Sequence, residues 1–532
     1  MRQEGAFPVP IDASLVSEPN LSFLDRGAGK LILCCWLFAA ALAWCFLRSS
    51  YADWGKDGAA DPVPLILRIP VMLAMAVPAL LLIGRDDRLA WLAGLSISLG
   101  TVPLLPFLPF LRDYTHLVVL VWLVSVSVGA FRLAPLRSVP LWGIAFLLFI
   151  AVCVVSMVVS FTTFQNIWQL KVGVAYLVLF GSFALLLYAI SVDPEKSEKR
   201  FVGLLDGFVW GIGGQAIVAL VAIPLLFYIP VSEGNDTVFG FGYYDKYKSL
   251  LSGPVSLGML FLISVPLVLL WAYRSAVLPC SKGGWLLPSA AIGWAVVVYL
   301  QTMPWLMMAT GSRTARLVFP VMLLALVFAS PATRRVALSM IPSSVAAYFV
   351  GFFYQSLPSA VERFYTTQVD PSRDISDRFL SIADRTPLAM DTIRKMNHSS
   401  PVAQLIGLGP GTGGYRTSGF PEPHNFLMNV WAETGWLGAA LLVAFFVLLV
   451  GGLLRSAASG RPDSFAARML LVALLAFGPV IITYNPWNWG VGMGLVLMLC
   501  TAVVCFTARR RSLHIGAKSS AALGLPDAAH RP

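Results

Sequence analysis

Charged residues are scarce in this sequence, and their scarcity excludes a soluble protein. Only 12% of the 532 residues are Asp, Glu, Lys or Arg, whereas 58% are hydrophobic and the mean hydropathy is +0.77. A soluble domain of this composition would have too little polar surface to face water. The apolar runs, at roughly 20 residues each, have the length that crosses a bilayer as a helix. The sequence therefore predicts an all-α, polytopic integral membrane protein.

Cysteine and histidine are also few, and their spacing does not fit the common metal sites. None of the seven cysteines lies in the long polar segment 355–425, so that segment has neither a disulfide framework nor CxxC metal chemistry. Four of the five histidines have no partner spacing that suggests zinc: His116, His398, His514 and His530. Three aspartates of the segment are candidate ligands for a divalent cation, but alternating arginines favour ion pairs instead: Asp370, Asp374, Asp377, Arg373 and Arg378. We expect no metal ion and no cofactor.

Neither a cleavable targeting segment nor a nucleic-acid partner is expected. Residues 1–29 are polar and contain proline, and the first apolar run begins only near Lys30. The net charge of +11 arises from Lys and Arg in short clusters between apolar runs, as the positive-inside rule predicts. Membrane lipids are therefore the expected surroundings of the chain.

Hydropathy predicts about 12–14 spans, and fourteen apolar runs qualify as candidates. Three prolines indicate a kinked or broken end for the third run. The approximate limits are 30–47, 64–83, 89–107, 114–131, 139–160, 170–190, 203–229, 251–273, 285–304, 313–329, 336–354, 426–454, 468–484 and 488–507. The expected organisation is a cytoplasmic tail (1–29), an N-terminal transmembrane bundle (30–354), a large periplasmic loop (355–425), C-terminal transmembrane helices (426–507) and a basic cytoplasmic tail (508–532).

Charge placement orients these spans. Seven clusters of Arg and Lys fall on one side, which predicts that this side and both termini are cytoplasmic. The opposite side then carries a loop around Gly240–Leu250, the turn Thr310–Arg316 and the segment 355–425. That segment has balanced charges and, in ISDRFLSIADRTPLAMDTIRKM, apolar residues at helical spacing. It predicts a small amphipathic helical cap.

His424 is the principal candidate for chemistry. It lies just before an apolar run and is preceded by Pro421 and Pro423, and Asn425 can cap the helix that follows. A structural histidine at the membrane interface is the ordinary interpretation. The functional interpretation is a general base that titrates near neutral pH. Glu433 lies just inside the same apolar run, where a carboxylate is costly unless it has a partner, so we expect one.

Basic residues on the same side suggest an anion site. Arg313 follows Gly311-Ser312 at a predicted helix start, where the guanidinium and the helix dipole both favour an anion. Arg316 lies one turn later and is equally well explained by snorkelling to the interface. Lys246 and Lys248 face the same compartment, so a phosphate or pyrophosphate fits better than a carboxylate.

A glycine-rich segment precedes His424, but it does not fit a nucleotide site. The sequence from Gly407 to Gly414 reads GLGPGTGG and lacks both a GK[ST] ending and a preceding strand. It also lies on the side of the membrane away from ATP. A flexible turn that brings the loop back to His424 is the better interpretation.

Three segments together resemble the O-antigen ligase and polysaccharide polymerase superfamily. PHNFLMNVWAETGWLG resembles the signature in which an HN-x-x-L segment and a downstream E-x-G-x-x-G open the helix after the large periplasmic loop. TGSRTARL resembles the family's Ser-Arg segment at the periplasmic start of an earlier helix, and LIGLGPGTGGY resembles the G-x-G turn ahead of the histidine. The resemblance covers about residues 305–455. The chain departs from the family in having about two spans more than the usual twelve, so the N-terminal third stays unexplained.

The resemblance implies a GT-C-like, metal-independent, inverting glycosyltransferase at the periplasmic face of the bacterial inner membrane. The donor would be a glycan on undecaprenyl diphosphate. The acceptor would be the lipid A–core for a ligase or a second lipid-linked repeat for a polymerase, and the absence of an Arg-x10-Gly spacing in the loop favours a ligase. The family histidine matches His424, the Ser-Arg arginine matches Arg313, and the basic residues of the preceding loop best match Lys246 or Lys248.

The chemistry of such a reaction agrees with these residues. A glycosyl diphosphate already carries a good leaving group, so the protein has to stabilise pyrophosphate charge and deprotonate a hydroxyl. Arg313, Arg316 and the two lysines suit the first task, and His424 suits the second. Supporting roles are expected for four further residues: Asn425, Glu433, Arg378 and Arg416.

Two other classes of protein remain as alternatives. A flippase of lipid-linked oligosaccharides has a similar number of spans, but flippases alternate access around a midplane site and are commonly built from two related halves. The two halves of this chain look unlike each other. A scaffold for envelope polysaccharide synthesis needs no titratable cluster, and would leave His424 and Arg313 far apart.

Overall fold

The computed structural model describes sixteen parts of the chain, and every structural statement below refers to them. They are residues 27–49, 62–99, 114–130, 139–164, 167–225, 229–230, 237–239, 241–242, 246–247, 249–251, 254–277, 289–365, 385–410, 425–459, 463–483 and 490–522.

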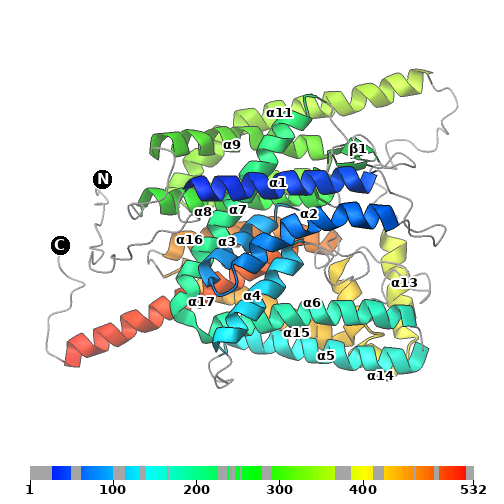
Figure 1. The fold of residues 1–532 in the computed structure, drawn as a ribbon, viewed down its shortest axis with the longest axis vertical. Coiled ribbons are helices and arrows are strands. Elements are labelled where there is room, and N and C mark those ends of the chain that lie inside the picture. Colours follow the sequence, from blue (N-terminus) through cyan, green and yellow to red (C-terminus); the bar gives the residue numbers. More distant parts are fainter. Residues whose placement is uncertain are drawn as a thin grey trace.

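The all-α prediction is confirmed, and each of the fourteen predicted spans coincides with one helix (Figure 1). These helices are α1 (Gly27–Ser49), α2 (Pro62–Leu81), α3 (Asp86–Ser96), α4 (Tyr114–Ala130), α5 (Leu141–Phe164), α6 (Ile167–Val192), α7 (Ser197–Ala222), α8 (Pro254–Val277), α9 (Ser289–Thr310), α10 (Arg313–Ala329), α11 (Pro331–Tyr365), α15 (Phe426–Ala457), α16 (Asp463–Thr483) and α17 (Gly490–Ala522). A 3-10 turn, η5 (Pro194–Lys196), precedes α7.

Strands are confined to the segment between α7 and α8. β1 (Ile229–Pro230) pairs antiparallel with β2 (Thr237–Phe239), with Ile229 opposite Phe239. β3 (Phe241–Gly242) pairs antiparallel with β4 (Lys246–Tyr247). Each strand is two or three residues long, so these pairs are local hairpins within a helical protein.

Six helical segments are long and apolar enough to cross a membrane. They are Gly27–Cys45, Leu141–Phe161, Pro194–Ala222, Val255–Arg274, Phe426–Ala457 and Val491–Arg510. Four shorter apolar helices accompany them: Ile69–Leu81, Tyr114–Ser127, Leu177–Val192 and Thr314–Ala329. The chain is therefore a polytopic membrane protein, and the full count of about 12–14 spans remains a prediction.

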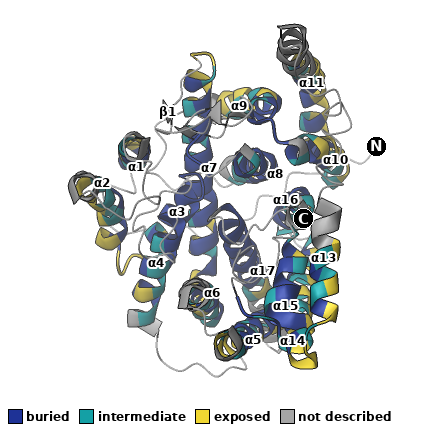
Figure 2. Cartoon of the chain, turned by 90° about the vertical axis from the view of Figure 1, so that its right-hand side faces the viewer, coloured by how far each residue is buried: buried dark blue, intermediate teal, exposed yellow. Residues whose placement is uncertain are grey.

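The centre of the bundle is formed by α3, α7, α8 and α17, whose residues are mostly buried (Figure 2). The outer helices point large apolar side chains away from the protein, with Leu317, Leu81 and Phe328 among the most exposed. Such an apolar outer surface suits lipid and would be costly in water. Burial and exposure thus follow the pattern of a membrane bundle.

The predicted span 89–107 differs from its prediction in length. α3 has only 11 residues and ends at Ser96, so at 1.5 Å per residue it is too short to cross a bilayer alone. The prolines that indicated a broken end follow it, at Pro103, Pro106 and Pro109, outside the described residues. A break in this span is therefore confirmed, and it comes earlier than the prolines themselves.

α3 packs unusually closely against α7. A Cβ at Gly94 of α3 would overlap the backbone of Leu204, and one at Gly207 of α7 would overlap the backbone of Trp91. Gly203 and Gly211 lie one turn to either side of Gly207 and also face α3. Small residues every four positions let two helices approach until their backbones touch, which is a common interface inside membranes.

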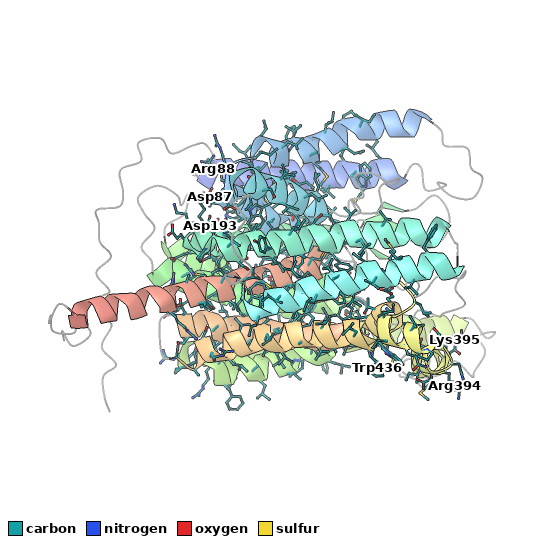
Figure 3. The ribbon with its side chains drawn as sticks, turned by 90° about the horizontal axis from the view of Figure 1, so that it is seen from below. Asp87, Arg88, Asp193, Arg394, Lys395 and Trp436 are labelled. Atoms are coloured by element: carbon teal, nitrogen blue, oxygen red, sulfur yellow. The ribbon has the colours of Figure 1, made fainter. Side chains whose placement is uncertain are left out.

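Polar contacts place the basic clusters at one end of the bundle. Arg468 of α16 donates to the Ala329 carbonyl at the end of α10 (3.0 Å), and Arg510 of α17 donates to Ser456 Oγ at the end of α15 (3.0 Å). Glu198 at the start of α7 pairs with Arg274 and Arg509 at the ends of α8 and α17. We call this end of the molecule the basic end. Figure 3 shows Asp87, Arg88 and Asp193 towards it, and Arg394, Lys395 and Trp436 towards the opposite end.

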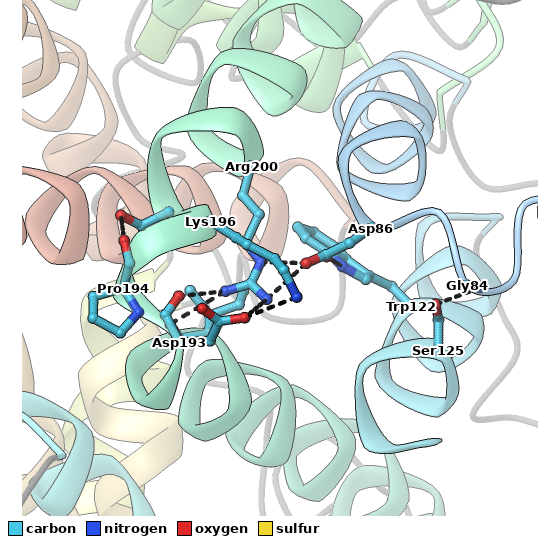
Figure 4. Close-up of polar contacts among 10 residues, drawn as sticks. Gly84, Asp86, Trp122, Ser125, Asp193, Pro194, Lys196 and Arg200 are labelled. Carbon is cyan, nitrogen blue, oxygen red and sulfur yellow. Dashed lines mark hydrogen bonds and ion pairs between the residues drawn. The ribbon is translucent and has the colours of Figure 1, made fainter. Parts of the chain in front are cut away.

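A buried ion pair stabilises the basic end (Figure 4). Arg200 of α7 is 1% exposed, and its guanidinium contacts the Asp86 carboxylate of α3 at 2.6 Å and the Asp193 carbonyl at 2.9 Å. Trp122 of α4 donates its indole N–H to the other oxygen of Asp86. The charges are therefore matched and hydrogen-bonded, which a buried charge requires.

The large polar segment is partly helical, as predicted. α13 (Arg385–Asn397) and α14 (Pro401–Ile406) lie at the end opposite to the basic end (Figure 1). α11 continues to Tyr365, into the segment predicted to be loop. α13 confirms the second half of the predicted amphipathic cap, and residues 375–384 of that prediction lie outside the described residues.

Candidate functional site

The candidate site residues are described to different extents. His424, Lys248, Arg378 and Arg416 lie outside the described residues. The backbones of Arg313 and Lys246 are described, as the first residues of α10 and β4, but their side chains are not. The side chains of Arg316, Asn425 and Glu433 are described, and all three are partly buried. The site is therefore built from the elements that carry these residues.

Asn425 caps α15, as its sequence position predicts. Its backbone is extended (φ −136°, ψ 118°), and its side-chain oxygen accepts a hydrogen bond from the Met428 amide at 3.2 Å. This satisfies one of the four amides that the first turn of a helix leaves without a partner. His424 directly precedes this cap in the sequence and lies outside the described residues.

α15 is broken nine residues after it begins. Gly435 has φ +66° and ψ −171°, a conformation outside the helical region that glycine adopts readily. In an unbroken helix the carbonyls of Ala432 and Glu433 would accept from the amides four residues later. Here they accept from the amides of Leu408 and Gly409 instead, each at 2.9 Å. Ser156 of α5 donates a further hydrogen bond to the Glu433 carbonyl at 2.6 Å.

The glycine-rich turn before His424 is built to reach this break. Gly407 and Gly409 have φ of +84° and +100°, so both need glycine for their backbone conformation. They also need it for space, because a Cβ at Gly407 would overlap the Glu433 carbonyl and one at Gly409 would overlap Ser160. The turn is packed against α5 and α15, and two of its amides bind α15 carbonyls. The structure thus shows a turn packed against α15, whereas the predicted return of the loop to His424 concerns residues 411–424, outside the described residues.

A small hydrophobic cluster holds the loop helices on α15. Met396 of α13 is fully buried against Trp431 and Ala432 of α15. Ile393 and Leu408 pack around them. The opposite face of α13 carries exposed Arg394, and Asp391 pairs with Lys395 at 2.8 Å. α13 is thus amphipathic, with its apolar side on α15.

Glu433 lies between the loop and α5. Its backbone carbonyl is bound by Ser156 and Gly409, and its carboxylate is close enough to the Cys153 thiol of α5 to interact electrostatically. The following residue, Thr434, donates its hydroxyl to the Val430 carbonyl at 2.6 Å. These contacts support the backbone where the helix breaks. The expected partner of the Glu433 carboxylate stays a prediction.

Trp436 follows the break and lies on the outer surface. It is 61% exposed and packs against Trp431, with 4.9 Å between ring centroids. Tryptophan is enriched where a membrane meets water. The break in α15 therefore lies where the interface is expected, about 20 residues before Arg455 at the other end of the helix.

The Thr310–Arg313 turn is also tightly built. Gly311 has φ +62°, and Ser312 caps α10 by accepting from the Ala315 amide at 3.3 Å. Thr310 Oγ1 accepts from the Ser312 amide at 3.2 Å. Gly258 of α8 packs against this turn, and a Cβ there would come within 2.8 Å of Ser312. The predicted helix start at Arg313 is confirmed.

Arg316 links three helices near this turn. Its guanidinium donates to the Met308 carbonyl of α9 at 2.7 Å. Its own carbonyl accepts from the Tyr348 hydroxyl of α11. At least one donor of this arginine is thus used within the protein, which agrees with the structural interpretation of Arg316.

The start of α10 and the start of α15 lie at the same end of the bundle. Both helices pack against α16. The last residues of both lie at the basic end, where Arg468 and Arg510 bind them. Their first residues, Arg313 and Phe426, therefore lie at the opposite end, as the sequence predicts. Within the described parts of the chain, no group of three or more His, Cys, Asp or Glu side chains is placed to hold a metal ion.

Sequence reasoning passed over one residue of this region, Asn429. It is 2% exposed, and its amide oxygen has no hydrogen-bond partner in the part of the chain that the structure describes. Leaving a buried oxygen without a donor costs about 1–3 kcal/mol. Its position in the sequence could have indicated it, because Asn429 is a polar residue inside an apolar run, four residues after Asn425 and four before Glu433. That spacing places all three on one face of a helix.

Comparison with known proteins agrees with the sequence motifs. Residues 298–443 match the family model described as O-antigen ligase. The matched segment runs from α9 to α15 and contains Arg313, Arg316, His424, Asn425 and Glu433. No curated protein matches the chain. The resemblance stated from the motifs is therefore confirmed, and over residues 298–443 this chain is similar to the O-antigen ligase family.

Proposed function

We propose that the protein transfers a glycan from an undecaprenyl-diphosphate donor to an acceptor hydroxyl at the periplasmic face of the bacterial inner membrane. The family match supports a glycan-transfer role in O-antigen or related polysaccharide assembly. The finer proposal rests on one observation, that the capped helices α10 and α15 begin at the same end of the bundle. This arrangement brings the element that begins with Arg313 and the element that follows His424 in the sequence to one end of the bundle.

The acceptor side of the reaction is assigned to α15. His424 immediately precedes the Asn425 cap of α15 in the sequence. As a neutral imidazole it takes the proton of the acceptor hydroxyl while the hydroxyl oxygen attacks the anomeric carbon. A positioned general base of this kind contributes roughly 10²–10⁴-fold to a rate. Attack from the face opposite to the leaving group inverts the anomeric configuration.

The donor side is assigned to α10 and the hairpin β3–β4. As the new glycosidic bond forms, the bond from the anomeric carbon to the diphosphate oxygen breaks, and undecaprenyl diphosphate leaves with the electron pair. Arg313 in the first turn of α10, assisted by Lys246 and Lys248, stabilises that charge, and Arg316 adds to the local positive potential. No metal ion takes part in this scheme.

Two acceptors are compatible with this site. The lipid A–core makes the protein a ligase, and a second lipid-linked repeat makes it a polymerase. Both present a sugar hydroxyl at the membrane surface, and both leave the roles of His424 and Arg313 unchanged.

The flippase alternative gains no support from the cavity that the structure contains. This cavity, of about 260 Å³, lies between α8, α9, α11 and α16. Apolar side chains such as Leu269, Val297 and Leu300 form most of its lining, and none of its lining residues is charged. A transporter of lipid-linked sugars requires a charged site near the midplane.

The test is the envelope glycan profile of a deletion strain complemented with wild type or His424→Ala. We expect His424→Ala to abolish rescue. Long polymer retained on the carrier lipid would identify a ligase, and single repeat units would identify a polymerase. His398→Ala is the matched control, because His398 is exposed in the turn directly after α13 and we assign it no role. Full rescue by His424→Ala would refute the general base.

A further inference from the structure

Asn429 is the unsatisfied polar group closest in sequence to the proposed general base. It lies in α15, one turn after the Asn425 cap, and its side chain is almost completely buried. Its amide oxygen accepts no hydrogen bond in the described residues. Buried carbonyl oxygens are rarely left in this state, because removal from water without a new donor is unfavourable.

The backbone groups around the break in α15 are satisfied, although the buried indole N–H of Trp431 also lacks a hydrogen-bond partner in the described residues. The Asn425 side chain is used by the Met428 amide. The carbonyls released by the break in α15 are bound by Leu408, Gly409 and Ser156. The backbone of this region thus receives its hydrogen bonds from three separate elements, whereas the Asn429 amide oxygen does not. This contrast indicates that the Asn429 amide oxygen accepts its hydrogen bond from a ligand.

The position of Asn429 relates it to the site. Residues 425, 429 and 433 are spaced by four and share one face of the first part of α15. Asn425 follows His424 directly, and Glu433 contacts the turn and α5. Asn429 therefore lies on the same side of the helix as the polar groups at the entrance of the site.

The chemistry of the atom restricts its ligand. An amide oxygen only accepts hydrogen bonds, so its partner has to donate one. The oxygens of a diphosphate at neutral pH are acceptors and do not meet this need. Sugar hydroxyls do. Of the two groups that the proposed reaction brings to the site, the sugar hydroxyl fits this oxygen and the pyrophosphate does not.

We propose that Asn429 binds a hydroxyl of the acceptor sugar through its amide oxygen and positions that sugar for attack. This inference rests on the proposed function. The acceptor is assigned, rather than the donor, because Asn429 lies near the start of α15, five residues after His424 in the sequence, whereas the donor diphosphate is assigned to α10. Asn429 is then a specificity-determining residue for the acceptor.

The experiment compares Asn429→Leu with wild type, as full-length protein in nanodiscs. The donor is undecaprenyl-diphosphate-linked glycan, and the acceptor is lipid A–core or lipid-linked repeat, each extracted from cells. We expect the KM for the acceptor to rise about tenfold, with the KM for the donor unchanged. Leucine has a similar volume and removes the orphan oxygen, so the thermal unfolding midpoint should stay equal or rise. A purely structural asparagine would not produce this split.

Asn429→Ala is the second variant. It also removes the oxygen, but it leaves empty space where leucine fills it. If the acceptor KM rises in both variants, the cause is the lost hydrogen bond rather than the shape of the new side chain. It also keeps the test decisive if Asn429→Leu fails to fold. An active wild type with an unchanged acceptor KM in the folded variants overturns the role of Asn429 alone. A wild-type protein that transfers no glycan overturns the proposed function, and this inference with it.

Discussion

The two ends of the bundle are held together by different interactions. At the basic end, helices are joined by charged side chains, such as Arg200 with Asp86 and Lys30 with Asp206, both at 2.6 Å. At the opposite end they are joined by backbone groups and glycines, as where Leu408 and Gly409 bind the broken α15. At the basic end the buried Arg200 contacts two carboxylates, whereas at the opposite end the Asn429 amide oxygen has no hydrogen-bond partner in the described residues. The first arrangement suits stability, and the second leaves polar groups for a substrate.

Among the substitutions that test this difference between the two ends, we expect the largest effect from replacing Arg200. Arg200→Met leaves the half-buried Asp86 carboxylate without its cation, although the Trp122 indole still donates to it. The expected cost is therefore about 3 kcal/mol of unfolding free energy, the lower end of the range for breaking a buried pair. Thermal unfolding in detergent measures the loss. The folded fraction should retain the wild-type KM for both substrates, because the basic end is far from the site. A normal unfolding midpoint would show that the pair contributes nothing.

Gly407→Ala tests the opposite end. The new Cβ would overlap the Glu433 carbonyl and would strain a residue with φ +84°, at a cost of about 1–3 kcal/mol that falls on the turn. We expect faster proteolysis of the loop and reduced glycan transfer, with the bundle still folded. Gly213→Ala on α7 is the control, because nothing lies within 4 Å of its Cβ position. Equal proteolysis of both variants would contradict the packed turn.

Ser156→Ala is a milder change at the same place. It removes the hydroxyl that donates to the Glu433 carbonyl at 2.6 Å, while the Gly409 amide still binds that carbonyl. The expected cost is about 1 kcal/mol. Hydrogen exchange at the amides of Leu408 and Gly409 reports it, because a looser break exposes them more often. Unchanged exchange would mean that the turn alone supports the break.

The smallest effect is expected for Lys395→Ala. Its ion pair with Asp391 spans one helical turn, and both side chains are more than a third exposed. Exposed pairs of this kind contribute at most about 0.5 kcal/mol, and less at high salt. A thermal unfolding midpoint equal to that of wild type at 0.5 M salt is the expected result. A large loss would mean that the loop end also depends on charge, and would remove the contrast with Arg200.

Much of the fold was predictable because membrane helices follow simple rules. A run of about 20 apolar residues must be helical in lipid, and each such run contains a helix here. The caps at Asn425 and Ser312 were also predictable, since both side chains are ordinary N-caps at helix starts. The length of α3 was misjudged, because hydropathy does not show where a run leaves the helical conformation.

The least predictable features depend on contacts between distant segments. From the sequence, Gly435 is a glycine within a predicted helix. The sequence does not show that the helix breaks there, or that amides of residues near 408 bind the carbonyls released by the break. Ser156 carried no signal at all, because a serine within an apolar helix usually bonds its own backbone. Asn429 was visible as a polar residue in an apolar run, yet only its burial shows that it lacks a partner.

The sequence alone determined the class of the protein, the location of its helices and the family of its 298–443 segment. These follow from hydropathy, capping residues and short motifs, which are local properties of a chain. Only the tertiary structure decided how the glycine turn satisfies the broken α15, and which buried polar groups stay without a partner. Hydrogen bonds across hundreds of residues depend on which helices meet, and that is settled by packing rather than by any single segment.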